Sequence, residues 1–406
     1  MLTSQAVILC GGRGTRLGSI TDSVPKPMVE VNGRPFLAWL LDQLKENGVR
    51  EIVLLTGYLG HIVEEYFGDG SKFGMKIHYS RGPLEWDTGR RLWEARDLLD
   101  DHFLLLYSDN YASFFARRLE QTFEKHALLA CLSVHPRPAK NNVRLSAEGV
   151  VLEYDSTRRA PGLEAIEIGY ALFSKKIFDY YEHPDCNFNV VIRKLVEAGQ
   201  VCAHLVRGDY YSVSDQERLK ITRQYLSPKK ILLIDRDGTI NRKAPRGEYI
   251  SRWEDFEFIP DTVEALKALA KLGYQFIVIS NQAGVGRVIL PESQVWDIDR
   301  RMVDSLAANG ITILRSYYCF HHWTDGCFCR KPNPGLFFQA SRDFRLRLPA
   351  TWYIGDDPRD CLAAYEAGCK SIYIGDSSDL HELPPEKMPQ FSFESLSGIL
   401  KHTGDL

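Results

Sequence analysis

The chain has 406 residues, of which 44% are hydrophobic and 25% charged, values typical of folded globular proteins that exclude a disordered chain. A formal net charge of -3 gives no overall attraction to nucleic acid or to an anionic membrane, so neither is expected as a partner. The longest apolar runs fall short of a bilayer span and the N-terminus lacks a signal-peptide pattern, so we expect a cytoplasmic protein. Most of the nine cysteines lie in apolar segments and are expected to stay reduced.

This length exceeds one ordinary core and predicts two domains. Short apolar strands alternate with amphipathic helices in both halves, as in doubly wound α/β folds. Pro228 to Lys230 form the one obvious junction, with no Gly/Ser-rich linker beside it. We therefore expect two doubly wound α/β domains, over residues 1–227 and 228–406.

The first expected strand, residues 5–10, leads directly into the glycine-rich turn GGRGTRL. Glycines let backbone N–H groups approach a phosphate, and the arginines of this turn add positive charge. Lys26 lies between two prolines that stiffen its loop and offers another cation. We expect a nucleoside triphosphate to bind here, through Gly11, Gly12, Gly14, Thr15, Arg16 and Lys26.

The pattern next predicts helices over residues 36–47, 59–67 and 88–99 and strands over 51–55 and 103–107. The last of these strands ends just before Asp109 in the segment YSDN. Ligands of open α/β sheets bind outside the carboxyl ends of the strands. Asp109 is therefore a candidate Mg²⁺ ligand.

Together, GGRGTRL, the following PKP and NGRPFLAWLLDQL resemble the opening of the sugar-1-phosphate nucleotidyltransferases. The likeness continues through GYALF at residues 169–173 to about residue 226. It implies a Rossmann-like domain that transfers a nucleotidyl group from a nucleoside triphosphate to a sugar 1-phosphate. In that reaction Arg16 and Lys26 would stabilise the triphosphate, and Asp109 would hold Mg²⁺.

Three departures from that family affect the expected activity. The first is Arg90 and Arg91, which stand where relatives have small residues beside the base and sugar. The second is the segment LEYDSTRR, which replaces the motif that usually contacts the sugar phosphate, and in which Arg158 or Arg159 offers the positive charge. Where relatives place a second metal-binding aspartate, this chain has Ser212, with Asp215 as the alternative ligand. A domain that only binds sugar phosphate or dimerises is therefore the competing hypothesis, and a homo-oligomer is compatible with it.

In the second half, the apolar run Ile231 to Ile234 predicts a buried parallel strand, followed by Asp235, Asp237 and Gly238. Asp235 can attack a phosphorus atom to form an aspartyl-phosphate. Asp237 can then protonate the leaving oxygen and later deprotonate a water molecule. Such crowded carboxylates favour Mg²⁺ as a counterion.

Further polar residues follow two more expected strands and a turn. Ser280 and Asn281 end FIVISN and could hold a phosphoryl group, Lys331 in CRKPNPG offers a cation, and Asp356 in WYIGDD an acid. In this order the motifs resemble those of haloacid dehalogenase superfamily phosphatases, over residues 230–376. The resemblance implies a capless fold with Mg²⁺ held by Asp235, Asp237 and Asp356.

The segment CFHHWTDGCFC offers three sulfurs and an imidazole for a structural zinc ion. The expected ligands are Cys319, His321, Cys327 and Cys329, with His322 as a competitor for His321. This loop resembles a zinc-bearing branch of the superfamily that contains heptose 1,7-bisphosphate phosphatases and histidinol-phosphate phosphatases.

Arg287 and Arg330, together with Lys331, supply more positive charge than one phosphate needs, so we expect a substrate with two phosphates. The two resemblances together imply an enzyme of nucleotide-activated heptose synthesis, which removes the 7-phosphate and couples the remaining 1-phosphate to a nucleotide. By resemblance the nucleotide is GMP, taken from GTP. The alternatives are a phosphatase with a degenerate first domain and a histidinol-phosphate phosphatase.

Overall fold

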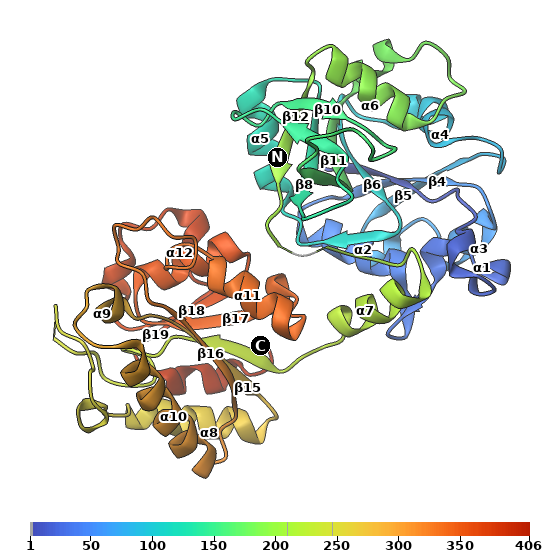
Figure 1. Ribbon diagram of the computed structural model, residues 1–406. Coiled ribbons are helices and arrows are strands. Elements are labelled where there is room, and N and C mark those ends of the chain that lie inside the picture. The colour runs from blue at the N-terminus through green and yellow to red at the C-terminus, as the bar shows by residue number, and fades with distance from the viewer. Residues whose placement is uncertain (1–2, 209, 246) are drawn as a thin grey trace. The chain divides into compact units, whose positions relative to one another are not determined.

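The computed structural model describes residues 3–208, 210–245 and 247–406, and the chain divides into two compact units, Met1–Ser227 and Pro228–Leu406. In each unit, helices cover both faces of a sheet (Figure 1). Among the described residues, no helix combines the length and the apolar character that crossing a membrane requires.

The N-terminal unit is built on a nine-stranded sheet. Its strands are β1 (Gln5–Leu9), β4 (Glu51–Thr56), β5 (Lys76–Arg81), β6 (His102–Tyr107), β8 (Ala130–Pro136), β9 (Val143–Leu145), β10 (Val151–Tyr154), β11 (Ala165–Ser174) and β12 (Val201–Leu205). The main order is β10-β9-β11-β6-β1-β4-β5, with β8 between β11 and β12. Strands β5, β4, β1 and β6 are mutually parallel, whereas β11 runs antiparallel to β6. Two small ribbons complete the unit: β2 (Glu30–Val31) with β3 (Arg34–Pro35), and β7 (Asn110–Ala112) with β13 (Tyr210–Ser212).

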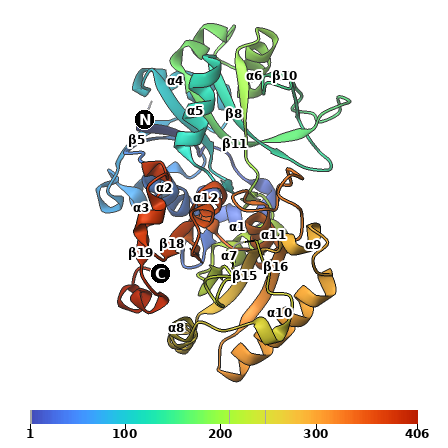
Figure 2. The same cartoon turned by 90° about the vertical axis from the view of Figure 1, so that its left-hand side faces the viewer.

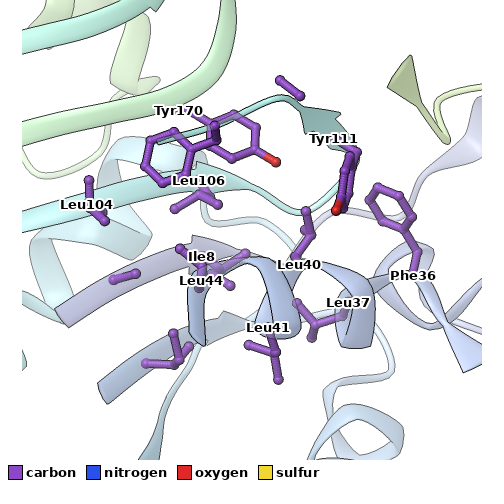
Figure 3. Close-up of a cluster of buried hydrophobic side chains, with 14 of the residues drawn as sticks. Ile8, Phe36, Leu37, Leu40, Leu41, Leu44, Leu104, Leu106, Tyr111 and Tyr170 are labelled. Carbon is purple, nitrogen blue, oxygen red and sulfur yellow. The ribbon is translucent and has the colours of Figure 1, made fainter. Parts of the chain in front are cut away.

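Alternate residues of the central strands build two cores. The helices are α1 (Ile20–Ser23), α2 (Phe36–Glu46), α3 (Gly60–Phe67), α4 (Thr88–Glu94), α5 (Ala116–His126), α6 (Phe188–Glu197) and α7 (Gln216–Leu226). On one face, Ile8 and Leu106 pack with leucines of α2 (Figure 3). On the other face, Val7 and Leu105 pack with α4 and α6. The apolar residues that recur with helical and strand periodicity in the sequence therefore form the cores on the two faces of the sheet.

The C-terminal unit has a six-stranded parallel sheet in the order β16-β15-β14-β17-β18-β19. The strands are β14 (Ile231–Ile234), β15 (Gln275–Asn281), β16 (Ile313–Cys319), β17 (Trp352–Gly355), β18 (Lys370–Ile374) and β19 (Phe391–Phe393). The helices are α8 (Pro260–Lys271), α9 (Ala283–Gly286), α10 (Glu292–Ala308), α11 (Gly335–Phe344) and α12 (Pro358–Ala367). One core contains residues of α8 and α10, and the other contains residues of α11 and α12, so these pairs cover opposite faces (Figures 1 and 2). Strand β14 is central, as its apolar run predicts.

One predicted helix is shorter than expected. The helix predicted to reach residue 99 ends at Glu94 and is followed by a 3₁₀ turn, Arg96–Leu98. A longer 3₁₀ segment, Leu396–His402, lies near the end of the chain. Tight 3₁₀ turns are frequent at helix ends and connections, where apolar periodicity does not distinguish them from α-helix.

Candidate active sites

The carboxyl ends of β14 and β17 bring acidic side chains together in the C-terminal unit. Carboxylate oxygens of Asp235, Asp356 and Asp360 lie within 4.8 Å of one another. The loop after β14 passes so close that a Cβ at Gly238 would lie 2.1 Å from Asp356 Oδ2, and Gly238 has a φ of 95°. Glycine is therefore required here on both steric and conformational grounds.

The carboxylates of this cluster are buried and repel one another, and Lys331 and Lys243 offset part of that repulsion. Burial raises the pKa of Asp235 to about 6, with Lys331 opposing the rise and Asp360 adding to it. Burial and the negative charge of Asp235 raise the pKa of Asp356 to about 7, although Asp356 forms an ion pair with Lys243. Hard oxygen donors in this arrangement fit Mg²⁺, which would relieve the repulsion.

Lys331 is the buried centre of the site. Its Nζ lies 3.0 Å from Asp235 Oδ1 and 2.6 Å from Asp360 Oδ1, and it donates a hydrogen bond to the Tyr353 hydroxyl at 2.7 Å. Burial opposes its charge, but the two carboxylates outweigh this effect and raise the pKa of Lys331. A charged lysine is thus fixed directly beside Asp235.

The Asp237 carboxylate is held by its own set of donors, and its share in a metal site with Asp235 and Asp356 stays a prediction. The fully buried Arg236 donates to both of its oxygens at 2.9 Å, and Asn241 and Gln282 donate to it at 3.0 and 2.6 Å. Burial raises the pKa of Asp237, but these partners outweigh burial and the net shift is downward. Asp237 is therefore a carboxylate at rest, the form that accepts a proton.

Ser280 and Asn281 are the last residues of β15, as the apolar run predicts. Ser280 is buried and hydrogen-bonds Asp235. The Asn281 amide donates to the Lys331 carbonyl at 3.1 Å and accepts from the Lys331 N–H at 3.0 Å. The Asn281 side chain thus holds the loop that carries Lys331, and its expected contact with a phosphoryl group stays a prediction.

A cavity of about 710 Å³ opens beside these residues, and Asp235, Asp237, Ser280 and Lys331 line it. Arg287 and Arg330 also line it, at the positions expected for binding a second anion. The Arg287 guanidinium lies over the Trp323 ring, 5.0 Å from its centroid, and donates to the Tyr249 hydroxyl at 3.5 Å. The Nη1 atom of Arg330 is buried and has no hydrogen-bond partner among the described residues.

The predicted zinc ligands converge in the loop after β16. The three cysteine Sγ atoms lie 3.4, 3.5 and 3.7 Å apart, and His321 Nδ1 lies 3.1 Å from Cys329 Sγ and 3.7 Å from Cys319 Sγ. Tetrahedral Zn²⁺ with bonds of about 2.3 Å to sulfur requires separations of roughly 3.8 Å between sulfurs. His322 Nδ1 instead bonds Thr324 at 2.7 Å. The structure therefore favours His321 over His322.

In the N-terminal unit, the glycine-rich turn, Lys26 and Asp109 also come together. A Cβ at Gly14 would lie 3.0 Å from the Lys26 Cβ, and Lys26 forms an ion pair with Asp109. Gly11 and Gly12 precede this point, and Thr15 and Arg16 begin a short 3₁₀ turn after it. One lysine thus links the candidate phosphate-binding turn to the candidate metal ligand.

Arg91 fills the space beneath the glycine-rich turn. A Cβ at Gly11 would lie 2.3 Å from the Arg91 Cζ, and the buried guanidinium donates to the carbonyls of Thr56 and Pro83 at 2.8 and 2.6 Å. Arg90 instead pairs with Glu94 at 2.7 Å. Of the two arginines, Arg91 is the one that fills this space.

Ser212 lies opposite Asn110 in the β7–β13 ribbon, and the N–H of the next residue, Val213, donates to the Asp109 carbonyl at 2.9 Å. Ser212 is therefore close to Asp109 along the ribbon. Asp215 instead caps α7, where its carboxylate accepts from the Arg218 N–H at 2.9 Å. The structure thus engages Asp215 in a helix cap.

Three residues of these sites were not predicted from the sequence. Asp360 accepts from the N–H groups of Asp356 and Asp357 at 3.1 Å and forms a capping box of α12 with Asp357. The spacing of Asp357 and Asp360 in DDPRD is a signal that could have revealed it. Arg236 and Tyr353 give no such signal, because their partners are fixed by tertiary packing.

Comparisons with known proteins agree with the division into two domains. The nucleotidyl transferase family model matches residues 5–144, and the HAD-hydrolase-like model matches residues 328–398. A probable D-glycero-D-manno-heptose-1,7-bisphosphate 7-phosphatase of Thermoplasma volcanium is 40% identical over 127 residues, covering 31% of this chain and 85% of that protein. The D-glycero-beta-D-manno-heptose-1,7-bisphosphate 7-phosphatase of Pasteurella multocida is 32% identical over 180 residues, covering 43% and 96% respectively.

A proposed glucose-1-phosphate thymidylyltransferase of Bacillus anthracis has the same fold as the N-terminal unit, with a TM-score of 0.50 and 19% identity over 54% of this chain and 93% of that one. It supports the fold alone. The chain is an enzyme that carries a nucleotidyltransferase domain followed by a haloacid dehalogenase-type phosphatase domain, and through the latter it belongs to the family of the D-glycero-D-manno-heptose-1,7-bisphosphate 7-phosphatases.

Proposed function

We propose that the C-terminal unit removes the 7-phosphate of a heptose 1,7-bisphosphate and that the N-terminal unit couples the resulting heptose 1-phosphate to GMP from GTP. The observation that carries the first activity is the contact of Lys331 with Asp235, 3.0 Å apart in a cavity lined by further cations. The names of the relatives supply the sugar.

In the proposed hydrolysis, an Asp235 oxygen attacks phosphorus, and the bond from phosphorus to the sugar oxygen breaks. Asp237, after taking up a proton, donates it to the leaving oxygen, then accepts a proton from the water that releases phosphate from the aspartyl-phosphate. Lys331 and Ser280 hold Asp235 and face the incoming phosphoryl group. Bound Mg²⁺, held by Asp235 and Asp356, would neutralise negative charge on the phosphoryl oxygens.

The second phosphate of the substrate would meet Arg287 and Arg330. Within the part of the chain that the structure describes, the buried Nη1 of Arg330 has no hydrogen-bond partner. Arg330 follows Cys329 directly, so a zinc ion on Cys329 would fix the start of this arginine's loop. A bisphosphate satisfies these cations, whereas the cationic amine of histidinol phosphate would be repelled by them. This charge pattern favours the heptose substrate over the histidinol alternative.

In the proposed transfer, the sugar phosphate attacks the α-phosphorus of the nucleoside triphosphate and pyrophosphate leaves. Lys26 and Arg16 would stabilise the triphosphate, and Asp109 would hold Mg²⁺. The support is the joint placement of Gly14, Lys26 and Asp109. The competing proposal, a domain that binds without catalysis, is supported by Arg91 beneath Gly11 and by Asp215 in its helix cap.

One experiment separates these proposals. The protein is incubated with heptose 1,7-bisphosphate and Mg²⁺, with and without each of GTP, ATP, CTP and UTP, while phosphate and pyrophosphate are measured separately. We expect phosphate release without nucleotide and pyrophosphate release with GTP. Phosphate without pyrophosphate for any triphosphate, with both sugar anomers, would establish the phosphatase alone. Comparable kcat/KM for histidinol phosphate would contradict the proposed substrate.

A further inference from the structure

Two lysines hold the acidic cluster of the C-terminal unit in different ways. Lys331 is buried, with 4% of its side chain exposed, and contacts both Asp235 and Asp360. Lys243 forms an ion pair with Asp356, and 46% of the Lys243 side chain is exposed. Because the lysine stem is long and flexible, a half-exposed lysine can leave its partner without disturbing the core, whereas a buried one cannot. The ammonium group of Lys243 is therefore an exchangeable positive charge.

Lys243 stands near the start of the loop that follows β14. Just before it, the Arg242 N–H donates to the Glu257 carbonyl at 2.9 Å, which fixes the backbone at this point. The Lys243 side chain then passes the turn of the nucleophile motif so closely that a Cβ at Gly238 would collide with Lys243 Cε. Lys243 also lines the cavity of about 710 Å³ beside the cluster. Its ammonium group thus adjoins both Asp356 and the cavity.

Asp356 differs from its neighbour Asp357 in the cation that neutralises it. The Arg359 guanidinium donates to the two Asp357 oxygens at 2.8 and 2.6 Å. Asp356 instead accepts from Thr239 Oγ1 at 3.3 Å through Oδ1 and contacts Lys243 through Oδ2. A bidentate guanidinium fixes both oxygens of a carboxylate, whereas an ammonium group acts as a point charge that another cation can replace. Of these two acids, Asp356 is the one with a replaceable partner.

The Lys243 ammonium group and a metal ion would compete for the Asp356 carboxylate. Carboxylate oxygens of Asp235, Asp356 and Asp360 lie within 4.8 Å of one another, so an ion bound to this cluster would be a close neighbour of Lys243. Two cations at such short range repel each other, and burial of the cluster weakens the screening of that repulsion by solvent. Occupation of Asp356 by either cation therefore disfavours the other.

We propose that Lys243 exchanges with Mg²⁺ on Asp356, and that the released ammonium group then binds the oxygens of the phosphoryl group that reacts with Asp235. Phosphate oxygens are strong acceptors for a charged donor, so the substrate offers Lys243 a new partner in the cavity that it already lines. The inference rests on the proposed phosphatase function and deepens it, because it makes one lysine responsive to both the metal and the reacting phosphate.

The test measures metal affinity and turnover on the same full-length variants. Calorimetry with Mg²⁺ alone, in an Asp109→Ala background that removes the candidate metal ligand of the N-terminal unit, measures the affinity of the C-terminal site. Lys243→Met should bind Mg²⁺ roughly tenfold more tightly, because a competing cation is lost. At saturating Mg²⁺ the same variant should lose roughly tenfold in kcat/KM for the bisphosphate, because a charge-assisted hydrogen bond to phosphate is lost. Lys267→Met, which removes a lysine paired with Glu264 on α8, is the matched control.

The two effects have opposite signs, which a lysine that serves only to stabilise the fold would not produce. Lys243→Arg keeps the positive charge and should return both values toward those of the wild type. Unchanged or weaker Mg²⁺ binding by Lys243→Met would overturn the exchange, and tighter binding with unaltered kcat/KM would overturn the role toward the phosphate. A loss of both, with a lowered melting temperature, would also overturn the inference.

These outcomes are distinguishable from failure of the proposed function, because the Mg²⁺ titration requires no substrate. Tighter Mg²⁺ binding by Lys243→Met, in a protein that does not hydrolyse heptose bisphosphate, would keep the exchange and reject the proposed substrate. Hydrolysis of the bisphosphate by a protein whose Mg²⁺ affinity does not respond to Lys243→Met would do the reverse.

Discussion

The two candidate sites differ in how their acidic groups are held. In the C-terminal unit, Asp235 and Asp360 are tied to one buried lysine, and the helix cap of α12 fixes Asp360 in turn. In the N-terminal unit, Asp109 has Lys26 as its ionic partner, and Ser212 occupies the nearby ribbon position. The comparison teaches that several buried contacts fix the acids of the C-terminal site, whereas a single ion pair holds the candidate metal ligand of the N-terminal site.

The largest expected effect comes from Asp235→Asn. Because an amide cannot serve as the attacking anion, phosphate release should fall by roughly 10⁴-fold or more. Phosphate release from the bisphosphate measures it, with melting temperature as the check on folding. Asp304→Asn, an exposed acid of α10, should retain full activity. Substantial turnover by verified Asp235→Asn protein would contradict the assignment of the nucleophile.

Asp109→Ala should remove nucleotide transfer by roughly 10²–10³-fold while leaving phosphate release unchanged, since metal coordination is worth several kcal/mol. Pyrophosphate release in the presence of heptose 1-phosphate and GTP measures the effect. Asp97→Ala, an exposed acid in the same unit, is the control. If both activities fall together, the assignment of Asp109 to the transferase site alone is wrong.

The zinc prediction concerns how the C-terminal site is supported. Cys327→Ser should lose zinc in elemental analysis, lower the melting temperature and reduce phosphatase activity by roughly 10–100-fold, because Arg330 and Lys331 follow the cluster directly. Cys186→Ser, outside the cluster, should keep its metal content. Zinc-free wild-type protein with normal activity would reject the prediction.

Whether the sequence could predict a contact in these sites depends on whether its residues belong to a recognisable motif or to unrelated segments of the chain. Asp235 and Asp356 follow apolar runs, and parallel strands place such ends at one edge, so their meeting was predictable. The four zinc ligands lie in one short segment, so their convergence was also predictable. By contrast, the bonds from Lys331 to Tyr353 and from Arg91 to Thr56 join residues of unrelated segments. No periodicity or spacing encodes them, since they depend on the final packing of side chains.

Asp237 illustrates the same limit within a single motif. The spacing of DRDG predicts two acids beside a metal ion, but it does not reveal what the arginine between them contacts. Arg236 is 1% exposed, lies over the Tyr318 ring at 5.6 Å, and turns the carboxylate of Asp237 toward itself. An arginine between two aspartates would be solvated on a surface turn, so only its burial reveals its role.

The smallest expected effect comes from Arg236→Lys. This substitution tests whether buried contacts position the acids of the C-terminal site. Lysine keeps the charge but cannot make the three hydrogen bonds that Arg236 donates to Asp237. If Arg236 positions the carboxylate, kcat should fall roughly tenfold with little change in KM, because binding of the phosphates depends on other cations. Arg236→Met should fall further, so that lysine gives partial rescue. Arg242→Lys, in an exposed pair with Glu257, is the matched control. An equal loss in the lysine and methionine variants, with lowered melting temperature in both, would indicate that Arg236 serves only to fill the core.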